Sequence, residues 1–209
     1  AEDALRYSEE KFKKTFTTSP DSININRIDD GKYVSINQGF TNITGFTEAD
    51  VQGKTSLEIN IWDNPEDREK LAAGLREHGE VKNLATRFRT KTGGIVYGLL
   101  SASIMELDGT KHILSITRDI TLRELANRER KQLSAAIEQA TDTIVITDLD
   151  GTIIYVNPAF EHISGYRAEE AVGNNPRILK SGKHERSFYK SIWDTILSGK
   201  TWEGRLINK

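Results

Sequence analysis

The chain repeats itself at a spacing of 120 residues, and this repeat limits the fold more than any other feature of the sequence. Asp30-Gly31 recurs as Asp150-Gly151. The same spacing relates Asn37 to Asn157, Phe40 to Phe160, Ile43 to Ile163, Gly45 to Gly165, Gly53 to Gly173 and Gly79 to Gly199. A single register over about fifty positions indicates two copies of one structural unit. We therefore predict two successive domains of the same fold.

Each repeat has the same predicted order of elements. An amphipathic helix comes first, with apolar residues at helical spacing: Leu5, Phe12 and Phe16 in one copy, Leu133 and Ile137 in the other. Two short strands around the Asp-Gly turn follow, at residues 22–28 and 32–36, then at 143–147 and 152–156. Short helices come next, and a longer helix, at about 65–78 or 185–198, ends before Gly79 or Gly199.

The first repeat continues with three more predicted strands, at residues 81–89, 95–105 and 111–117. Consecutive hairpin strands pair directly, and the helical excursion must return to the sheet. We therefore predict an α+β fold in which a five-stranded antiparallel sheet carries helices on one face. The second repeat reaches Lys209 within its third strand, so we expect it to be truncated and to lack its last two strands.

These elements divide the chain into four predicted segments. They are a leading amphipathic helix at 1–18, a first domain at 19–121, a connector helix at 122–141 and a second domain at 142–209. Thr121 and Glu124 have the spacing of a capping box, which predicts a helix start there. The connector either packs on its own domain or acts as a signalling helix that pairs with a partner chain.

Charge and residue types exclude several function classes. Lys and Arg number 29 against 31 Asp and Glu, a balance that argues against direct nucleic-acid binding. The chain has no cysteine, which removes thiolate chemistry, and its four histidines lack the spacing of metal ligands. Its N-terminus is acidic and amphipathic, unlike a secretory signal, and no apolar run is long enough to span a bilayer. We expect a cytoplasmic module.

The most specific motif occurs in both repeats. Residues 37–46 read Asn-Gln-Gly-Phe-Thr-Asn-Ile-Thr-Gly-Phe, and residues 157–166 read Asn-Pro-Ala-Phe-Glu-His-Ile-Ser-Gly-Tyr. This pattern resembles a conserved stretch of the PAS family of sensory domains, and Asp119-Ile120-Thr121 resembles the exit motif of that family. The resemblance implies two PAS folds that form the sensor region of a larger signalling protein, of sensor histidine kinase or diguanylate cyclase type. Asp119, Thr121 and Glu124 would then form the signal exit.

The residues also indicate what the chain is not. We find no acid–base pair, nucleophile or metal constellation, so we expect a regulatory region and not an enzyme. Asn37 and Asn157 stand where a strand becomes a helix, and we interpret both as helix caps.

PAS domains hold small molecules between their helices and the inner face of the sheet. In the first repeat, four polar residues on predicted strands are candidates for lining such a pocket: Arg87, Tyr97, Ser101 and His112. The alternative is that each points to solvent from the other face of its strand.

The second repeat is similar to the flavin-binding redox-sensor PAS domains of the nitrogen-fixation regulator and the aerotaxis receptor, which carry Trp at the positions of Trp193 and Trp202. The resemblance implies a non-covalent FAD site formed by these two residues with Asn208 as a polar anchor. The alternative is that both Trp side chains fill a core.

Two other cofactors are disfavoured. Pro176 stands where light-sensing flavin domains carry their reactive Cys, which excludes a cysteinyl-flavin adduct. The haem-ligating His of oxygen-sensing PAS domains would fall at Arg68 or Phe188, so we do not expect haem.

We therefore predict a ligand- or redox-sensing input module that relays its signal through connector helices to a downstream effector domain. We expect a homodimer through the amphipathic helices, because the apolar stripe of the leading helix exceeds what one small sheet needs. The competing hypothesis is a ligand-free dimerisation and spacer module.

Overall fold

The computed structural model describes residues 2–209, with side chains at residues 6, 7 and 10–209. The chain divides into two compact units, one up to Ala126 and the other from Asn127 to Lys209. Of the predicted stripe on the leading helix, Leu5 lies outside the described side chains, Phe12 is 62% exposed and Phe16 is half-buried. The rings of Phe12 and Phe16 stack at 5.8 Å.

The first unit follows the predicted order of elements. Its helices are α1 (Glu2–Thr18), α2 (Gln38–Thr44), α3 (Glu48–Val51) and α4 (Pro65–His78). Its strands are β1 (Ser22–Arg27), β2 (Tyr33–Ile36), β3 (Glu80–Arg89), β4 (Ile95–Leu107) and β5 (Thr110–Asp119). Helix α5 (Thr121–Glu138) follows β5 directly and continues past the boundary of the unit.

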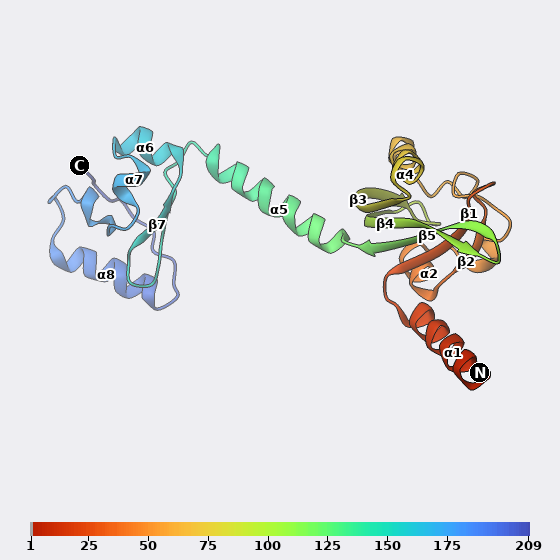
Figure 1. Cartoon of the computed structure of the whole chain (residues 1–209). Helices are drawn as coiled ribbons and strands as arrows, with labels where there is room; N and C mark the ends of the chain where they lie inside the picture. Colours follow the sequence, from red (N-terminus) through yellow and green to blue (C-terminus); the bar gives the residue numbers. More distant parts are fainter. Residues whose placement is uncertain (1) are drawn as a thin grey trace. The chain divides into compact units, whose positions relative to one another are not determined.

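The five strands form one antiparallel sheet in the order β2-β1-β5-β4-β3 (Figure 1), which confirms the predicted architecture. The first strand and the last strand are therefore neighbours in the middle of the sheet, and Ser22 lies opposite Thr117. Helix α2 packs against β1, and α4 packs against β3 and β4. This arrangement leaves one layer of helices over the inner face of the sheet.

Helix boundaries follow from capping residues. Asn37 caps α2 by accepting a hydrogen bond from the backbone N–H of Phe40, and Gly45 ends that helix with a φ of 77°. Helix α4 begins with Asn64 as its cap and Pro65 in its first turn, and Gly79 follows it in the left-handed conformation. The sequence predicted both ends of α4.

The start of α5 differs from the predicted capping box. The hydroxyl of Thr121 accepts from the backbone N–H of Tyr97 in β4 at 3.0 Å and so is committed to the sheet. The carboxylate of Asp119 accepts from the backbone N–H of Thr121 at 2.8 Å. The helix is therefore started by Asp119 and tied to β4 by Thr121, while Glu124 makes a backbone bond to Ile120.

The second unit repeats the first half of this fold. It contains β6 (Val145–Thr147), β7 (Ile153–Val156), α6 (Pro158–Ser164), α7 (Ala168–Ala171), a 3-10 helix (Pro176–Leu179) and α8 (Arg186–Leu197). Strands β6 and β7 form a two-stranded antiparallel sheet. Asn157 caps α6 and Gly165 ends it with a φ of 76°, as their counterparts do in α2.

Two predictions for the second unit need correction. The expected third strand is a single β-bridge between Lys180 and Asn208. Ile163 lies three residues after Phe160, a helical spacing that predicts a pair facing the sheet, but it is 65% exposed. Both differences have one cause, because a sheet of two strands offers less surface for pairing and for packing than the five strands of the first unit.

Each unit has its own hydrophobic core around the same phenylalanine of the repeat. The first consists of Tyr33, Phe40, Val51, Ile61, Trp62, Phe88 and Leu100. The second consists of Ile153, Val156, Phe160, Ala171 and Leu179. Phe40 and Phe160 are 2% and 0% exposed, so the repeated motif places an aromatic ring at the centre of each core.

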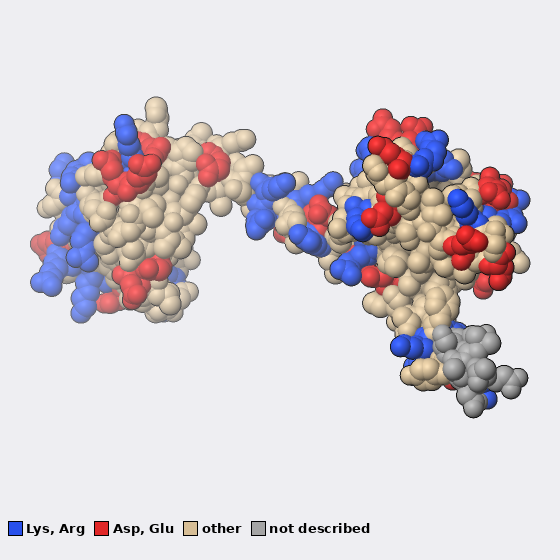
Figure 2. Space-filling view, viewed as in Figure 1, with Lys and Arg blue, Asp and Glu red and all other residues tan. Residues whose placement is uncertain are grey.

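The surface carries mixed charge. Figure 2 shows acidic and basic side chains interspersed over the visible face of the first unit. Among the helices that the structure describes, none combines the length and the apolar character that a membrane span requires.

Candidate ligand-binding site

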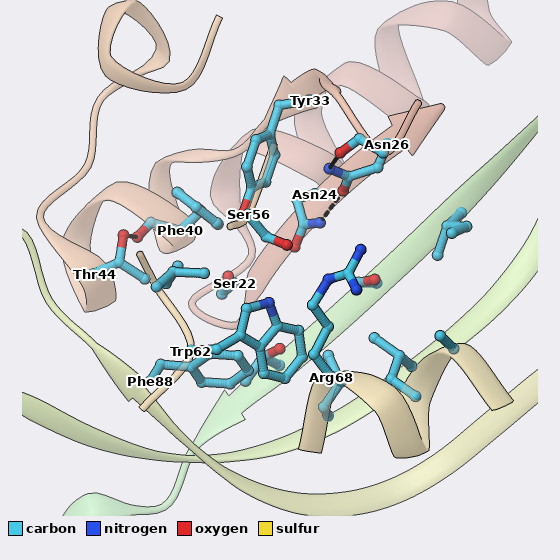
Figure 3. Close-up of a pocket in the computed structure, with 18 of the residues that line it drawn as sticks. Ser22, Asn24, Asn26, Tyr33, Phe40, Thr44, Ser56, Trp62, Arg68 and Phe88 are labelled. Carbon is cyan, nitrogen blue, oxygen red and sulfur yellow. Dashed lines mark hydrogen bonds between the residues drawn. The ribbon is translucent and has the colours of Figure 1, made fainter. Parts of the chain in front are cut away.

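A cavity of about 130 Å³ lies in the first unit between the inner face of the sheet and the helices (Figure 3). Its lining comes from every layer of the unit. The residues are Ser22, Asn24, Asn26, Gly31, Tyr33, Phe40, Ile43, Thr44, Ser56, Ile61, Trp62, Arg68, Leu71, Ala72, Leu75, Phe88, Leu100, Ile113, Ser115 and Thr117.

Polar side chains form the floor of this cavity. They come from alternate positions of the two central strands, Ser22, Asn24 and Asn26 on β1 and Ser115 and Thr117 on β5. Alternation along a strand places such residues on one face, so a polar patch lies on a surface that is otherwise apolar. The amide of Asn24 donates to Asn26 at 2.6 Å, and Asn26 donates to the carbonyl of Gly31 at 3.1 Å. This chain connects the floor to the Asp-Gly turn.

Aromatic rings form the side wall of the cavity, from the edge strands β2 and β3 and from the segments that cover the sheet. Trp62 and Phe88 lie 5.1 Å apart, and Tyr33 meets Phe40 edge to face at 5.6 Å. Burial raises the pKa of Tyr33 above its ordinary value, so its hydroxyl stays protonated in the physiological range. The wall is therefore apolar, with one neutral hydroxyl.

The indole N–H of Trp62 is a second polar group of the wall. Trp62 is 8% exposed, and within the described part of the chain its Nε1 atom has no hydrogen-bond acceptor. An unpaired buried donor costs about 1–3 kcal/mol, so such groups are rare without a water or ligand. In Figure 3 this nitrogen faces the interior bounded by Phe40, Asn24 and Arg68.

Arg68 enters the cavity from the first turn of α4 (Figure 3). Its neighbour Asp67 is buried and fixes this turn to the sheet, since Thr86 on β3 donates to its carboxylate at 3.0 Å. Lys70 pairs with the other oxygen of Asp67 at 2.9 Å. Arg68 itself has no hydrogen bond or ion pair with any side chain that the structure describes.

The predicted pocket residues of the first repeat are not in this lining. Arg87 is exposed and pairs with Asp63 at 3.0 Å, and Ser101 accepts from the backbone N–H of Asn83 on the outer face. His112 is buried, with Nδ1 at 3.0 Å from the carbonyl of Thr110, but its strand places Ile113 and Ser115 in the cavity instead. On β3, β4 and β5 the residues that face the cavity are therefore the neighbours of the predicted ones, and the predicted residues lie on the other face of the sheet.

Two of the predicted pocket residues lie near one of the predicted signal-exit residues, outside the cavity. Arg87 and Tyr97 line a second, more open recess together with Glu124. Asp119 and Thr121 lie at the start of α5, where they hold the helix to the sheet as described above.

The three predicted flavin residues of the second unit contact different parts of that unit. Trp193 lies against Gly151 and Asn175, since a Cβ at Gly151 would be 2.9 Å from its ring. Trp202 meets Phe188 edge to face at 5.8 Å, and Phe188 in turn stacks on His184 at 4.3 Å. Asn208 pairs with Lys180 through its backbone and is exposed.

Comparison with known proteins identifies the family. The PAS domain family matches residues 20–122, and the PAS fold family matches residues 131–209. The chain is a tandem of PAS domains. These are sensory domains of signalling proteins, and the described chain shows no catalytic domain.

Relatives share parts of this chain. A nitrogen fixation regulatory protein of Klebsiella oxytoca is 41% identical over 73 residues, which cover 35% of this chain and 15% of that protein. The methyl sulfide methyltransferase-associated sensor of Methanosarcina acetivorans is 27% identical over 179 residues, or 82% of this chain and 16% of that protein. The tandem thus spans less than a fifth of the length of these relatives.

Among solved structures, an RNA-binding light-oxygen-voltage receptor superposes with a TM-score of 0.51 at 16% identity. The match covers 61% of this chain and 37% of the receptor chain. At this identity the similarity establishes the fold alone.

Proposed function

We propose that this tandem is the input module of a larger signal-transduction protein, of sensor histidine kinase or diguanylate cyclase type. In this proposal the first PAS domain binds a small molecule in its cavity, and α5 carries the resulting change towards an effector domain. The observation that carries the proposal is the cavity itself, because its polar floor and the unpaired N–H of Trp62 are groups that a bound ligand would satisfy.

The position of the cavity supports a relay to α5. Two of its floor residues, Ser115 and Thr117, belong to β5, the strand that leads directly into α5. A ligand that prefers one arrangement of β5 would shift the population of arrangements at the start of the helix. The hydrogen bond between Thr121 and the backbone of Tyr97 is the first contact that such a shift would alter.

A thermal-shift screen of small metabolites tests the binding step. A specific ligand must raise the melting temperature of the 209-residue chain by mass action. The variant Ala72→Leu should abolish that rise, because Ala72 lines the cavity and leucine would fill it. Ala73→Leu, at an exposed position of the same helix, is the matched control.

The outcomes separate the two hypotheses from the sequence. Loss of the shift in Ala72→Leu and its retention in Ala73→Leu would support a sensor. Absence of any stabilising compound for the wild type would favour the ligand-free dimerisation and spacer module.

FAD binding by the second PAS domain is a separate prediction. It is supported by the resemblance of that domain to flavin-binding redox sensors, and the chain shares 41% identity over 73 residues with a nitrogen fixation regulatory protein. Because the second domain has a sheet of only two strands here, one wall of the expected cavity is absent, and the chain from 1 to 209 should bind FAD weakly or not at all. A chain extended beyond Lys209 should bind FAD, and Trp193→Ala should abolish that binding. A colourless extended chain would contradict the FAD prediction.

A further inference from the structure

We propose that the cavity of the first PAS domain recognises a small monocarboxylate with an apolar body. This inference rests on the proposed sensor function and assigns the chemical class of its ligand.

The charge of the cavity is the first argument. Among the lining residues that the structure describes, Arg68 is the only charged one, and no carboxylate of the protein pairs with it. A partly buried guanidinium without a counter-ion is unfavourable, and a ligand carboxylate would neutralise it through two parallel hydrogen bonds. One cation suits one negative charge, which favours a monocarboxylate over a phosphate dianion.

The hydrogen-bond donors are the second argument. The Trp62 N–H, which can only donate, lacks an acceptor, and it faces the same interior as Arg68 in Figure 3. A carboxylate accepts hydrogen bonds only, so one such group can satisfy both the guanidinium and the indole. Neutral hydroxyl or amide ligands would leave the charge of Arg68 unpaired.

The size and the wall of the cavity define the rest of the ligand. Tyr33, Phe40, Phe88 and Leu100 give it aromatic and aliphatic surfaces. A volume of about 130 Å³ is close to that of an engineered apolar cavity of about 150 Å³ that binds benzene. The body of the ligand should therefore be one ring, or a branched chain of similar size.

Isothermal titration calorimetry on the 209-residue chain tests the assignment. The probes are benzoate and 4-methylpentanoate, each compared with its neutral amide, benzamide or 4-methylpentanamide. We expect at least one acid to bind and its amide to bind about tenfold more weakly or not at all, since the amide cannot form the charge-assisted pair. The shapes within each pair are nearly the same, so the difference reports the charge.

Three variants locate the interaction. Arg68→Met, which keeps the stem and removes the charge, should weaken binding of the acid at least tenfold and bring acid and amide to equal affinity. Arg76→Met, at an exposed position of the same helix, should leave binding unchanged. Trp62→Phe keeps an aromatic ring, although a smaller one, removes the N–H and should weaken the acid more than the amide. Circular dichroism and melting temperature verify that each variant folds.

Two results would overturn the assignment. One is binding of an amide as tightly as its acid, or acid binding that Arg68→Met does not weaken. The other is failure of both acids to bind the folded wild type. Neither result touches the sensor proposal, because the metabolite screen with Ala72→Leu decides independently whether the cavity binds any ligand.

Discussion

Asn37 and Asn157 make four equivalent hydrogen bonds, each within its own PAS domain. The side-chain oxygen of each accepts from the residue at the start of the first strand, Ile23 or Ile144, and from the capped helix at Phe40 or Phe160. The side-chain amide donates to carbonyls at the end of the preceding helix, Phe16 or Ile137, and of the linking loop, Asp21 or Asp142. One buried residue thus joins helix, loop, strand and helix in each domain.

Replacing either asparagine should destabilise its own domain. Asn37→Ala leaves several buried backbone groups unpaired, so we expect a loss of about 2–4 kcal/mol in the free energy of unfolding. Urea denaturation should show the loss in one transition for Asn37→Ala and in the other for Asn157→Ala. Asn42→Ala, on the exposed side of α2, should cost less than about 0.5 kcal/mol. Equal effects of Asn37→Ala and Asn42→Ala would contradict the role of Asn37.

Gly39 should not tolerate alanine. A Cβ at this position would overlap the carbonyl oxygen of Asp21 and lie 2.9 Å from that of Ser19, and both are backbone atoms that cannot swing away. We expect Gly39→Ala to cost about 1–3 kcal/mol, although alanine favours helix. The second domain carries Ala159 at the equivalent position, so Ala159→Gly provides the reciprocal comparison. A Gly39→Ala protein as stable as the wild type in urea would refute the close approach.

Thr86→Val should weaken both the stability and the ligand site of the first domain. The substitution keeps the shape of Thr86 but removes the donor to the buried carboxylate of Asp67, so we expect a loss of about 1–3 kcal/mol. Because Asp67 fixes the turn that carries Arg68, affinity for the ligand should fall as well. Thr92→Val, at an exposed position of the turn after β3, controls for the loss of a hydroxyl. If calorimetry finds unchanged ligand affinity in Thr86→Val, the contact between Thr86 and Asp67 does not position Arg68.

Asp50 should make the stability of the first domain depend on pH. Lys91 donates to its carboxylate at 2.8 Å, and with the backbone and hydroxyl of Thr47 it holds the pKa of Asp50 well below the ordinary value of 3.8. A carboxylate with a lowered pKa in the folded state stabilises the fold when the pH is above its ordinary, unfolded-state pKa. This contribution is lost as the pH falls through the lowered pKa. Asp50→Asn should therefore be less stable than the wild type at pH 7, and the difference should shrink below about pH 4. Asp29→Asn controls for net charge, and a gap that stays constant with pH would contradict the assignment.

Self-association should depend on the leading helix. Phe12 is 62% exposed and stacks on Phe16, and an exposed aromatic stripe favours a second copy of the chain. We expect light scattering to give twice the 23.5 kDa of one chain, and Phe12→Glu to reduce the mass to that of the monomer. Lys13→Glu, on the same helix, should leave the dimer intact. A monomeric wild type at high concentration would overturn the dimer prediction.

The sequence predicted the fold far better than it predicted the site. Capping residues such as Asn37 and Gly79 act locally, so their roles were recognisable without the structure, and the repeat showed that each role occurs twice. The face to which a strand residue points depends on register, and register is set by distant partners. Asn24 and Ser115 therefore escaped prediction, while the candidates Arg87 and His112 do not line the cavity. The sequence did contain one indication of the site. The resemblance to oxygen-sensing PAS domains places Arg68 at the position of their haem-ligating His.

The pairing of Ser22 with Thr117 has a mechanical consequence. The chain enters and leaves the sheet of the first domain at the same end of the β1–β5 pair, which the ion pair of Asp21 and Arg118 closes at 3.4 Å. Tension applied through α1 and α5 would peel these strands apart one rung at a time and would not shear the whole ladder at once. The first rung to open carries two residues of the cavity floor. A ligand bound to both residues would hold the two strands together. Occupancy of the cavity would then be measurable as an increase in the force needed to unfold the domain.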